Sequence, residues 1–154
     1  MKSGDSSTSG GGLLIGRYSS RMGAKGRVAV PVKLREHLGD RVIISQGYEK
    51  SLLLVSREQW EKLTEFLRGR PVTAGPVRDT ERFLFGSAFE AEFDDQGRVV
   101  IPQELREFAG LADEAVFLGV GNRVEIWARE TWEKYSEKLG ERIGEMGEKI
   151  SDQK

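Results

Sequence analysis

The sequence predicts a mainly β protein with short helices, an α+β protein, built from two copies of one structural unit. The first observation is an internal repeat, because seven of the eleven residues in 26–36 recur in type 71 positions later. The second is a short run of β-branched apolar residues after a Gly-Arg pair in each copy, which is typical of a strand. The third is a proline at the end of each run, followed by apolar residues at helical spacing. A repeat of this length indicates two units that share one core.

Each copy opens with a turn that needs glycine. Gly26 and Gly97 stand directly before the arginines and can adopt the positive φ of a tight turn without steric cost. Pro31 and Pro102 then stop the strands, because proline lacks a backbone N–H and suits the first turn of a helix. The order predicted for each unit is therefore turn, strand and short helix.

The remaining apolar runs predict further strands and two longer helices. The expected strands are 13–18, 41–45, 51–55, 83–89, 115–120 and 124–127. Ser56 is a plausible N-cap for a helix that extends to about Leu67 and carries Trp60 on its apolar face. A second helix begins near Arg129, and glycines in its C-terminal part predict fraying beyond Leu139.

Composition shifts divide the chain into five segments. The Pro- and Gly-rich stretch between the two copies predicts a linker. The Ser/Gly-rich start of the chain predicts a disordered tail. The expected segments are a disordered N-terminal tail at 1–12, a first repeat at 13–68, a linker at 69–82, a second repeat at 83–139 and a frayed C-terminal tail at 140–154.

The repeated motif resembles the MraZ family of transcriptional regulators, within the wider AbrB/MazE/SpoVT group of DNA-binding domains. The family signature, Asp-x-x-Gly-Arg, is complete at 94–98, whereas Gly23 replaces the aspartate in the first copy. The resemblance covers about 13–135, including the Trp-containing helix after each copy. It implies two tandem AbrB-like repeats that interleave as a swapped-hairpin β-barrel, and copies of the chain that assemble into a ring-like homo-oligomer.

The resemblance also implies a function and a location. Proteins of this family bind short repeated sites in double-stranded promoter DNA through their Gly-Arg loops. The expected role is a sequence-specific regulator, a repressor at a division and cell-wall gene cluster promoter, in the nucleoid of the cytoplasm. The alternative is a ring-forming interaction protein, or a regulator acting through a toxin partner, with little DNA binding. That alternative is favoured if the missing aspartate disables the first loop.

Charge is distributed unequally between the two copies, although the formal net charge is only −1. Residues 6–35 carry six basic side chains and no acidic one, whereas residues 77–106 carry four basic and seven acidic side chains. A cluster of basic residues on one face is the electrostatic signature of a phosphate-binding surface. The first copy is therefore the expected DNA-binding half.

The candidate DNA-binding residues lie in and around the Gly-Arg turns. Arg27 can contact a guanine edge bidentately, Lys25 can contact phosphate as a point charge, and Gly26 shapes the turn. Weaker candidates are Arg17 and Arg21, on the strand that leads into the turn, and Arg98 in the second copy.

Arg98 has a competing structural role, because Asp94 and Asp95 stand beside it and can pair with it. Arg35 and Arg106 recur in both copies despite opposite surroundings, which favours a shared structural role for these two arginines.

Residues suited to catalysis or metal binding are scarce. The chain has no cysteine and one histidine, His37, so we expect no enzyme activity, no metal site and no cofactor. Trp60 and Trp132 are better explained as core residues than as stacking platforms for bases, because they lie at helical apolar spacing. No apolar run is long enough to span a bilayer, so we expect no membrane partner.

Overall fold

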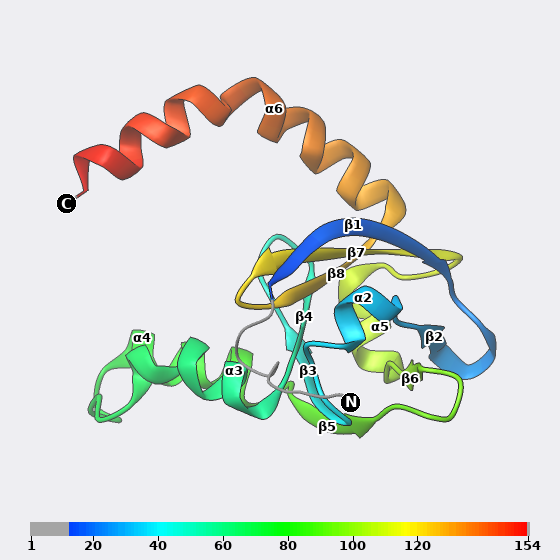
Figure 1. Ribbon diagram of the computed structural model, residues 1–154. Helices are drawn as coiled ribbons and strands as arrows, with labels where there is room; N and C mark the ends of the chain where they lie inside the picture. Colours follow the sequence, from blue (N-terminus) through cyan, green and yellow to red (C-terminus); the bar gives the residue numbers. More distant parts are fainter. Residues whose placement is uncertain (1–12, 154) are drawn as a thin grey trace.

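Strands from the two halves of the chain are interleaved. A computed structural model gives the structure of residues 13–153 (Figure 1), and the tail expected at 1–12 lies outside these described residues. The larger sheet is antiparallel and has six strands in the order β1-β7-β8-β4-β3-β5. Its strands are β1 (Leu14–Arg21), β3 (Arg41–Gln46), β4 (Leu52–Val55), β5 (Phe89–Glu92), β7 (Glu114–Gly121) and β8 (Val124–Ala128). The smaller sheet, called the ribbon below, pairs β2 (Arg27–Ala29) with β6 (Arg98–Val100).

The pairing pattern relates the two repeats by an approximate two-fold axis. The first strand of each repeat pairs with the third strand of the other, because β1 pairs with β7 and β5 pairs with β3. Equivalent strands meet at the centre of each sheet, as β4 with β8 and β2 with β6. The interleaving implied by the family resemblance is therefore confirmed.

One core is shared by both repeats and both sheets. It contains Val28 and Val99 from the ribbon and Phe117 and Ile126 from the larger sheet, all at most 1% exposed. Each ribbon strand buries its central valine and exposes its two outer residues, or leaves them half-buried. Neither repeat forms this core alone, because every wall of it includes strands from the other repeat.

Short helices follow both prolines, as predicted. They are α2 (Val32–Arg35) and α5 (Gln103–Ala109). Each buries one leucine, Leu34 or Leu105, in the shared core. The second helix ends at Gly110, which has a φ of 69° and so occupies the left-handed conformation that glycine adopts most readily.

The predicted N-cap at Ser56 is confirmed. Its hydroxyl accepts a hydrogen bond from the backbone N–H of Gln59, whose side chain accepts one from the backbone N–H of Ser56. This capping box starts α3 (Arg57–Leu63), which continues as the 3₁₀ turn η3 (Glu65–Leu67). Trp60 is 7% exposed and packs against Ile43, Leu53 and Val55 of the sheet, so its expected core role is also confirmed.

The strand expected at 83–89 is wrong, because helix α4 (Gly75–Leu84) covers its first two residues and part of the stretch expected as a linker at 69–82. Pro76 stands in its first turn, where a proline is tolerated, and Leu84 is buried against Trp60 and its neighbours. The run Phe83-Leu84-Phe85 has the composition of a strand, but burial of Leu84 and packing of the partly buried Phe83 against the same apolar cluster stabilise a helix there. The strand begins only at Phe89.

The expectation of fraying beyond Leu139 is also wrong, because α6 (Arg129–Asp152) is one helix of 24 residues. Glycine lowers helix stability but, unlike proline, keeps its N–H and adopts helical angles, so Gly140, Gly144 and Gly147 are accommodated. Only the first turns of α6 pack on the sheet, through Trp132 and Tyr135. Within residues 13–153, no helix is both long and apolar enough to cross a membrane.

Candidate nucleic-acid interface

The exposed face of the ribbon brings the two Gly-Arg pairs together. Arg27 lies opposite Val100, and Arg98 lies opposite Ala29. The two arginines are thus diagonal neighbours on one face, roughly 7–8 Å apart at their Cα atoms. An antiparallel two-stranded ribbon with arginines on its outer face has the width and chemistry to enter a DNA major groove.

The first loop is closed by backbone hydrogen bonds alone. The N–H of Gly23 donates to the carbonyl of Arg27 at 2.7 Å, and the N–H of Arg27 donates to the carbonyl of Ala24. Lys25 and Gly26 have φ values of 59° and 80°. Arg27 and Lys25 are exposed, and neither side chain forms an ion pair or hydrogen bond with another described residue. Both cations therefore face solvent.

The second loop is braced by Asp94. One carboxylate oxygen accepts 2.9 Å hydrogen bonds from the backbone N–H groups of Gln96 and Arg98, and the other accepts one from Arg98 Nε at 2.9 Å. The Arg98 backbone bond is the main reason that the pKa of Asp94 lies below its ordinary value of 3.8. The predicted pairing of Arg98 with a neighbouring aspartate is confirmed, with Asp94 as the partner. Arg98 is consequently less available to an anion than Arg27.

Each Gly-Arg loop is supported by an arginine from the other repeat. Nε of Arg106 donates to the carbonyl of Ile101 at 2.9 Å, and a Cβ at Gly26 would lie 2.7 Å from that Nε. The equivalent Arg35 donates to the carbonyl of Val30 at 3.0 Å, with a Cβ at Gly97 2.6 Å from its Nε. The predicted structural role of Arg35 and Arg106 is confirmed.

The close approach explains why glycine occupies both turns. At Gly26 a side chain would strain a backbone with positive φ and would also collide with the Ile101 carbonyl, 2.6 Å from the added Cβ. The sequence repeat indicated that the arginines act alike. It carried no signal that each one braces the loop of the other repeat.

Arg17 and Arg21 are exposed on β1, but neither joins the loop cluster. Arg21 ends β1 opposite Glu114, and it lines a polar cavity together with Asp113 and Glu130. Arg17 lies four residues earlier, about 13 Å along the strand, opposite Leu118 and on the side of the sheet that α6 covers. The structure thus groups Lys25, Gly26 and Arg27 and separates Arg17 from them.

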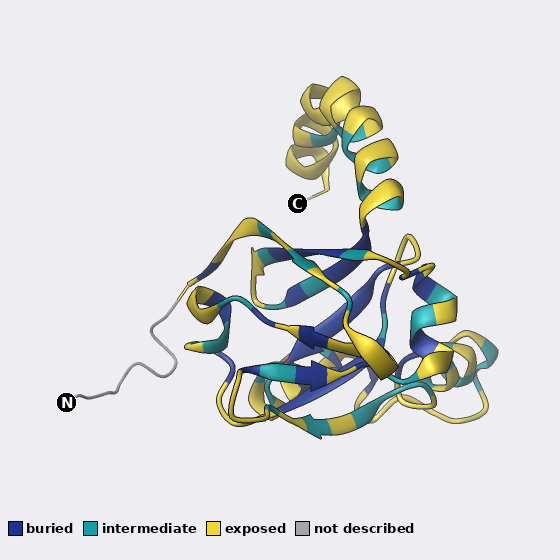
Figure 2. Ribbon diagram, turned by 90° about the vertical axis from the view of Figure 1, so that its right-hand side faces the viewer, coloured by how far each residue is buried: buried dark blue, intermediate teal, exposed yellow. Residues whose placement is uncertain are grey.

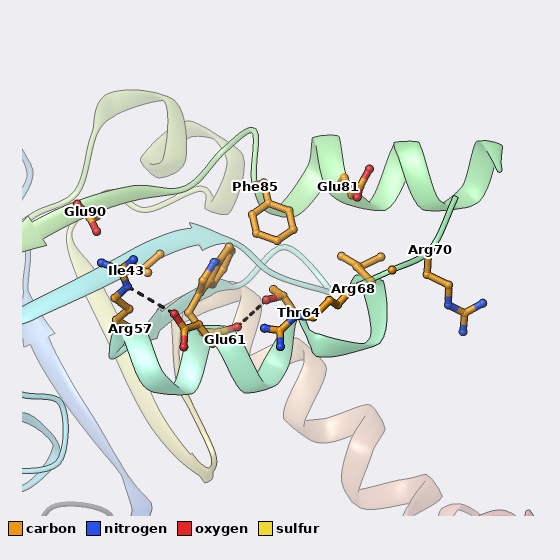
Figure 3. A pocket seen from close by; sticks show the side chains of 12 residues that line it. Ile43, Arg57, Glu61, Thr64, Arg68, Arg70, Glu81, Phe85 and Glu90 are labelled. Atoms are coloured by element: carbon orange, nitrogen blue, oxygen red, sulfur yellow. Dashed lines mark hydrogen bonds and ion pairs between the residues drawn. The ribbon is translucent and has the colours of Figure 1, made fainter. Parts of the chain in front are cut away.

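A second concave surface lies between α3 and α4 (Figure 3). Trp60 and Phe85 stack edge to face there, with ring centroids 5.4 Å apart, beside a cavity of about 550 Å³. The charged side chains around it are Arg57, Arg68, Arg70, Glu61, Glu81 and Glu90. Because these charges balance, this surface is a poorer match for a polyanion than the first loop. Among the described residues, no group of three or more His, Asp or Glu is placed to hold a metal ion.

The fold and the site define a class: a tandem-repeat protein of the AbrB-like group, whose halves exchange strands and present paired Gly-Arg turns on one ribbon. Comparison with known proteins gives the family. The family model described as "MraZ protein, putative antitoxin-like" matches the chain twice, over residues 13–83 and 84–146. The chain belongs to the MraZ family.

Curated relatives are similar over nearly their whole length, and each bears the name Transcriptional regulator MraZ. The protein from Heliobacterium modesticaldum is 40% identical over 140 residues, which cover 91% of this chain and 98% of the relative. The protein from Symbiobacterium thermophilum is 41% identical over 136 residues, covering 88% and 99%. The protein from Acetivibrio thermocellus is 41% identical over 142 residues, again covering 88% and 99%.

Proposed function

We propose that this protein is a sequence-specific DNA-binding transcriptional regulator that reads DNA with the first Gly-Arg loop and the outer face of the ribbon. The observation that carries the proposal is the exposed and unpaired side chain of Arg27. It lies on an exposed two-stranded ribbon, next to Lys25, without the aspartate that engages its counterpart Arg98. The names of the relatives support the regulatory role.

The chemistry of the loop assigns a role to each residue. A guanidinium that forms no internal pair keeps its full set of donors for O6 and N7 of guanine, the commonest specific contact in the major groove. Lys25 contacts a backbone phosphate and sets the register. Gly26 keeps the turn tight, so that both side chains project from one place. Arg98 and Arg21 contribute less, because acidic groups accompany them.

One such loop offers only a few contacts, so we infer that the protein acts as a ring-like homo-oligomer on repeated sites. Linking several weak sites raises their effective concentration and multiplies affinity without any new contact. In this proposal each subunit presents its first repeat, residues 13–68, to one short DNA element. The regulated DNA is the promoter of a division and cell-wall gene cluster, where the bound oligomer represses transcription, and the protein resides in the cytoplasmic nucleoid.

A gel-shift experiment tests the DNA-binding role. The wild-type protein is titrated against a duplex from upstream of its own gene, and against a duplex of the same length and base composition in scrambled order. We expect discrete shifted species with the native duplex and at least ten-fold weaker binding to the scrambled one. Equal affinity for both duplexes contradicts sequence specificity. Absence of any shift contradicts DNA binding and favours the interaction-protein alternative.

A further inference from the structure

The outer face of the ribbon is partly apolar. Its four side chains are those of Arg27, Ala29, Arg98 and Val100, and they lie on the face opposite the buried centres of β2 and β6. Figure 2 views the molecule from the side on which Figure 1 places the ribbon, and exposed residues there border buried strand centres. Val100 is 45% exposed, although its neighbour Val99 is buried. A ligand that approaches the ribbon therefore meets an apolar side chain as well as cations.

Arg27 and Val100 are close neighbours across the ribbon. The N–H of Ile101 donates to the carbonyl of Gly26 at 2.9 Å, so these two residues form a hydrogen-bonded pair. Hydrogen-bonded and non-hydrogen-bonded pairs alternate along an antiparallel ladder, so the next pair, Arg27 with Val100, is of the non-hydrogen-bonded kind. Side chains are closer in such a pair, with Cβ atoms about 4.5–5.5 Å apart. The Val100 methyl groups thus lie beside the first carbons of the Arg27 side chain.

The two repeats differ at this position of the ribbon. Ala29 and Val100 are equivalent, because they are 71 positions apart. The larger apolar side chain lies opposite Arg27, whose guanidinium is unpaired, and the smaller one lies opposite Arg98, which Asp94 engages. Strand propensity favours valine over alanine at both positions. It therefore does not explain why valine stands only beside the unpaired arginine.

We propose that Val100 contacts the C5-methyl group of a thymine in the base pair next to the guanine that Arg27 reads. Thymine is the only one of the four bases that presents a methyl group in the major groove, and short apolar side chains contact it there. Successive nucleotides of one strand are about 3.4 Å apart along the duplex axis, a spacing similar to that of the two side chains, so the pair reaches adjacent base pairs. The inference rests on the proposed function, and it makes a residue of the second repeat part of the surface that determines specificity.

A cycle of substitutions in protein and DNA tests the contact. Thymines in the shortest upstream duplex that the wild-type protein binds are replaced one at a time by deoxyuridine, which pairs with adenine in the same way and lacks only the C5-methyl group. We expect one of these replacements to weaken wild-type binding about four-fold, the contribution of one buried methyl group. Val100→Ser should bind the unmodified duplex more weakly than wild type and should be insensitive to that replacement. Fluorescence anisotropy supplies the four binding constants.

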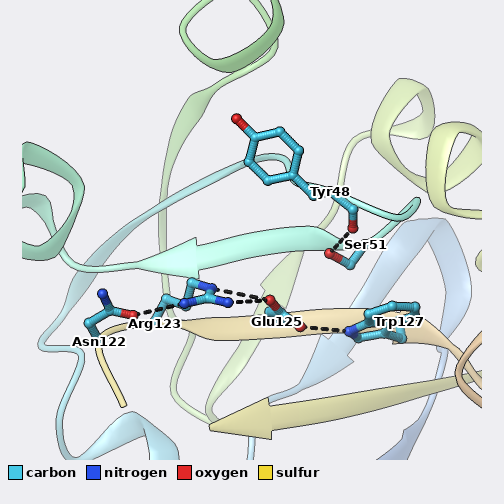
Figure 4. Close-up of polar contacts among 6 residues, drawn as sticks. All are labelled: Tyr48, Ser51, Asn122, Arg123, Glu125 and Trp127. Atoms are coloured by element: carbon cyan, nitrogen blue, oxygen red, sulfur yellow. Dashed lines mark hydrogen bonds and ion pairs between the residues drawn. The ribbon is translucent and has the colours of Figure 1, made fainter. Parts of the chain in front are cut away.

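Val120→Ser is the matched control variant. Val120 is also an exposed valine on a strand of the second repeat, 38% exposed, with an arginine close behind it in sequence. That arginine, Arg123, donates to Glu125 at 2.9 Å and to Asn122 at 3.0 Å, so its guanidinium is already engaged (Figure 4). Val120→Ser should keep the wild-type response to deoxyuridine, and both serine variants should melt near the wild-type temperature because each changes an exposed side chain.

The results separate this inference from the proposed function. A wild-type protein that binds the unmodified duplex but responds to deoxyuridine at no position overturns the Val100 contact alone. The same conclusion follows if Val100→Ser keeps the full wild-type sensitivity, because another residue then contacts the thymine. A wild-type protein that binds no upstream duplex contradicts the proposed function itself.

The position of the sensitive thymine gives a further check. Guanines of the same duplex are replaced one at a time by 7-deazaguanine, which lacks the N7 acceptor. One replacement should weaken binding of the wild-type protein more than that of Arg27→Ala, and this guanine should lie in the base pair next to the sensitive thymine. If the two bases are not in adjacent pairs, Arg27 and Val100 do not read the DNA together and the proposal is overturned.

Discussion

Arg27 and Arg98 occupy the same position in the two repeats but differ in what surrounds their guanidinium groups. Asp94 engages Arg98 through its side chain and its backbone N–H, whereas Gly23 offers no carboxylate to Arg27. Because glycine stands at position 23 in place of an aspartate, the first loop has no carboxylate to brace it. The same difference leaves the Arg27 guanidinium available to a ligand. One residue difference thus separates a structural arginine from a candidate DNA contact.

Replacing each arginine by alanine measures this difference. Arg27→Ala removes a bidentate contact, and we expect a loss of about 1–3 kcal/mol of binding free energy per engaged site. Arg98→Ala should lose much less affinity and some stability, because the ion pair with Asp94 is lost while the backbone hydrogen bonds of Asp94 remain. Fluorescence anisotropy on one operator compares the variants, with melting and light scattering as controls. An equal loss of binding by a folded, assembled Arg98→Ala protein contradicts the predicted asymmetry.

At the scale of elements, α2 and α5 support the ribbon loops across the boundary between repeats. Arg106 on α5 lies against Gly26, and Arg35 on α2 lies against Gly97 in the same way. The first loop, which we propose binds DNA, is therefore held in place by the second repeat. Its geometry depends on a residue far from it in sequence.

Substitutions of Arg106 and Arg35, the two arginines that lie against the loops, form a matched pair of variants. Arg106→Ala and Arg35→Ala each remove one hydrogen bond from a charged donor, so each should lower the free energy of unfolding by about 1–3 kcal/mol. Only Arg106→Ala should also weaken DNA binding, because only it loosens the first loop. Chemical denaturation and anisotropy are measured on both. If DNA binding falls equally in both variants, the effect comes from general loss of stability and the specific support is refuted.

At the scale of the whole molecule, two similar halves carry opposite local charge around similar turns. The approximate two-fold fold presents both loops on one ribbon, but only the first carries its cations, Lys25 and Arg27, without a compensating aspartate. We therefore expect DNA to approach the first loop rather than the second, which would give each subunit a preferred orientation on the duplex.

The salt dependence of binding reports how many phosphates each site engages. We expect four to six contacts per site, which gives a slope of about −4 to −5 when the logarithm of the binding constant is plotted against that of salt concentration. Anisotropy titrations at several salt concentrations supply the slope, with ionic strength changed by a monovalent salt only. A slope near zero contradicts an interface built on phosphate contacts.

Local features of this protein were determined by the sequence itself. The 71-residue repeat is visible in the sequence directly. Interactions between residues close in the chain produce the Gly-Arg turns, the β3–β4 and β7–β8 hairpins and the Ser56 cap. The sequence also predicts that Arg98 is paired and Arg27 is not. Asp94 precedes Arg98 by four residues, whereas Gly23 stands at the equivalent position before Arg27.

The long-range arrangement was decided only by the tertiary structure. Pairing β1 with β7 or with β3 satisfies the same alternation of apolar residues, because β3 and β7 are copies of one element, so periodicity alone does not choose between them. The brace of Arg106 on Gly26 depends on that choice. The helix at Gly75–Leu84 likewise depends on a long-range contact, because Leu84 is buried against Trp60 and the sheet, which no local rule places beside it.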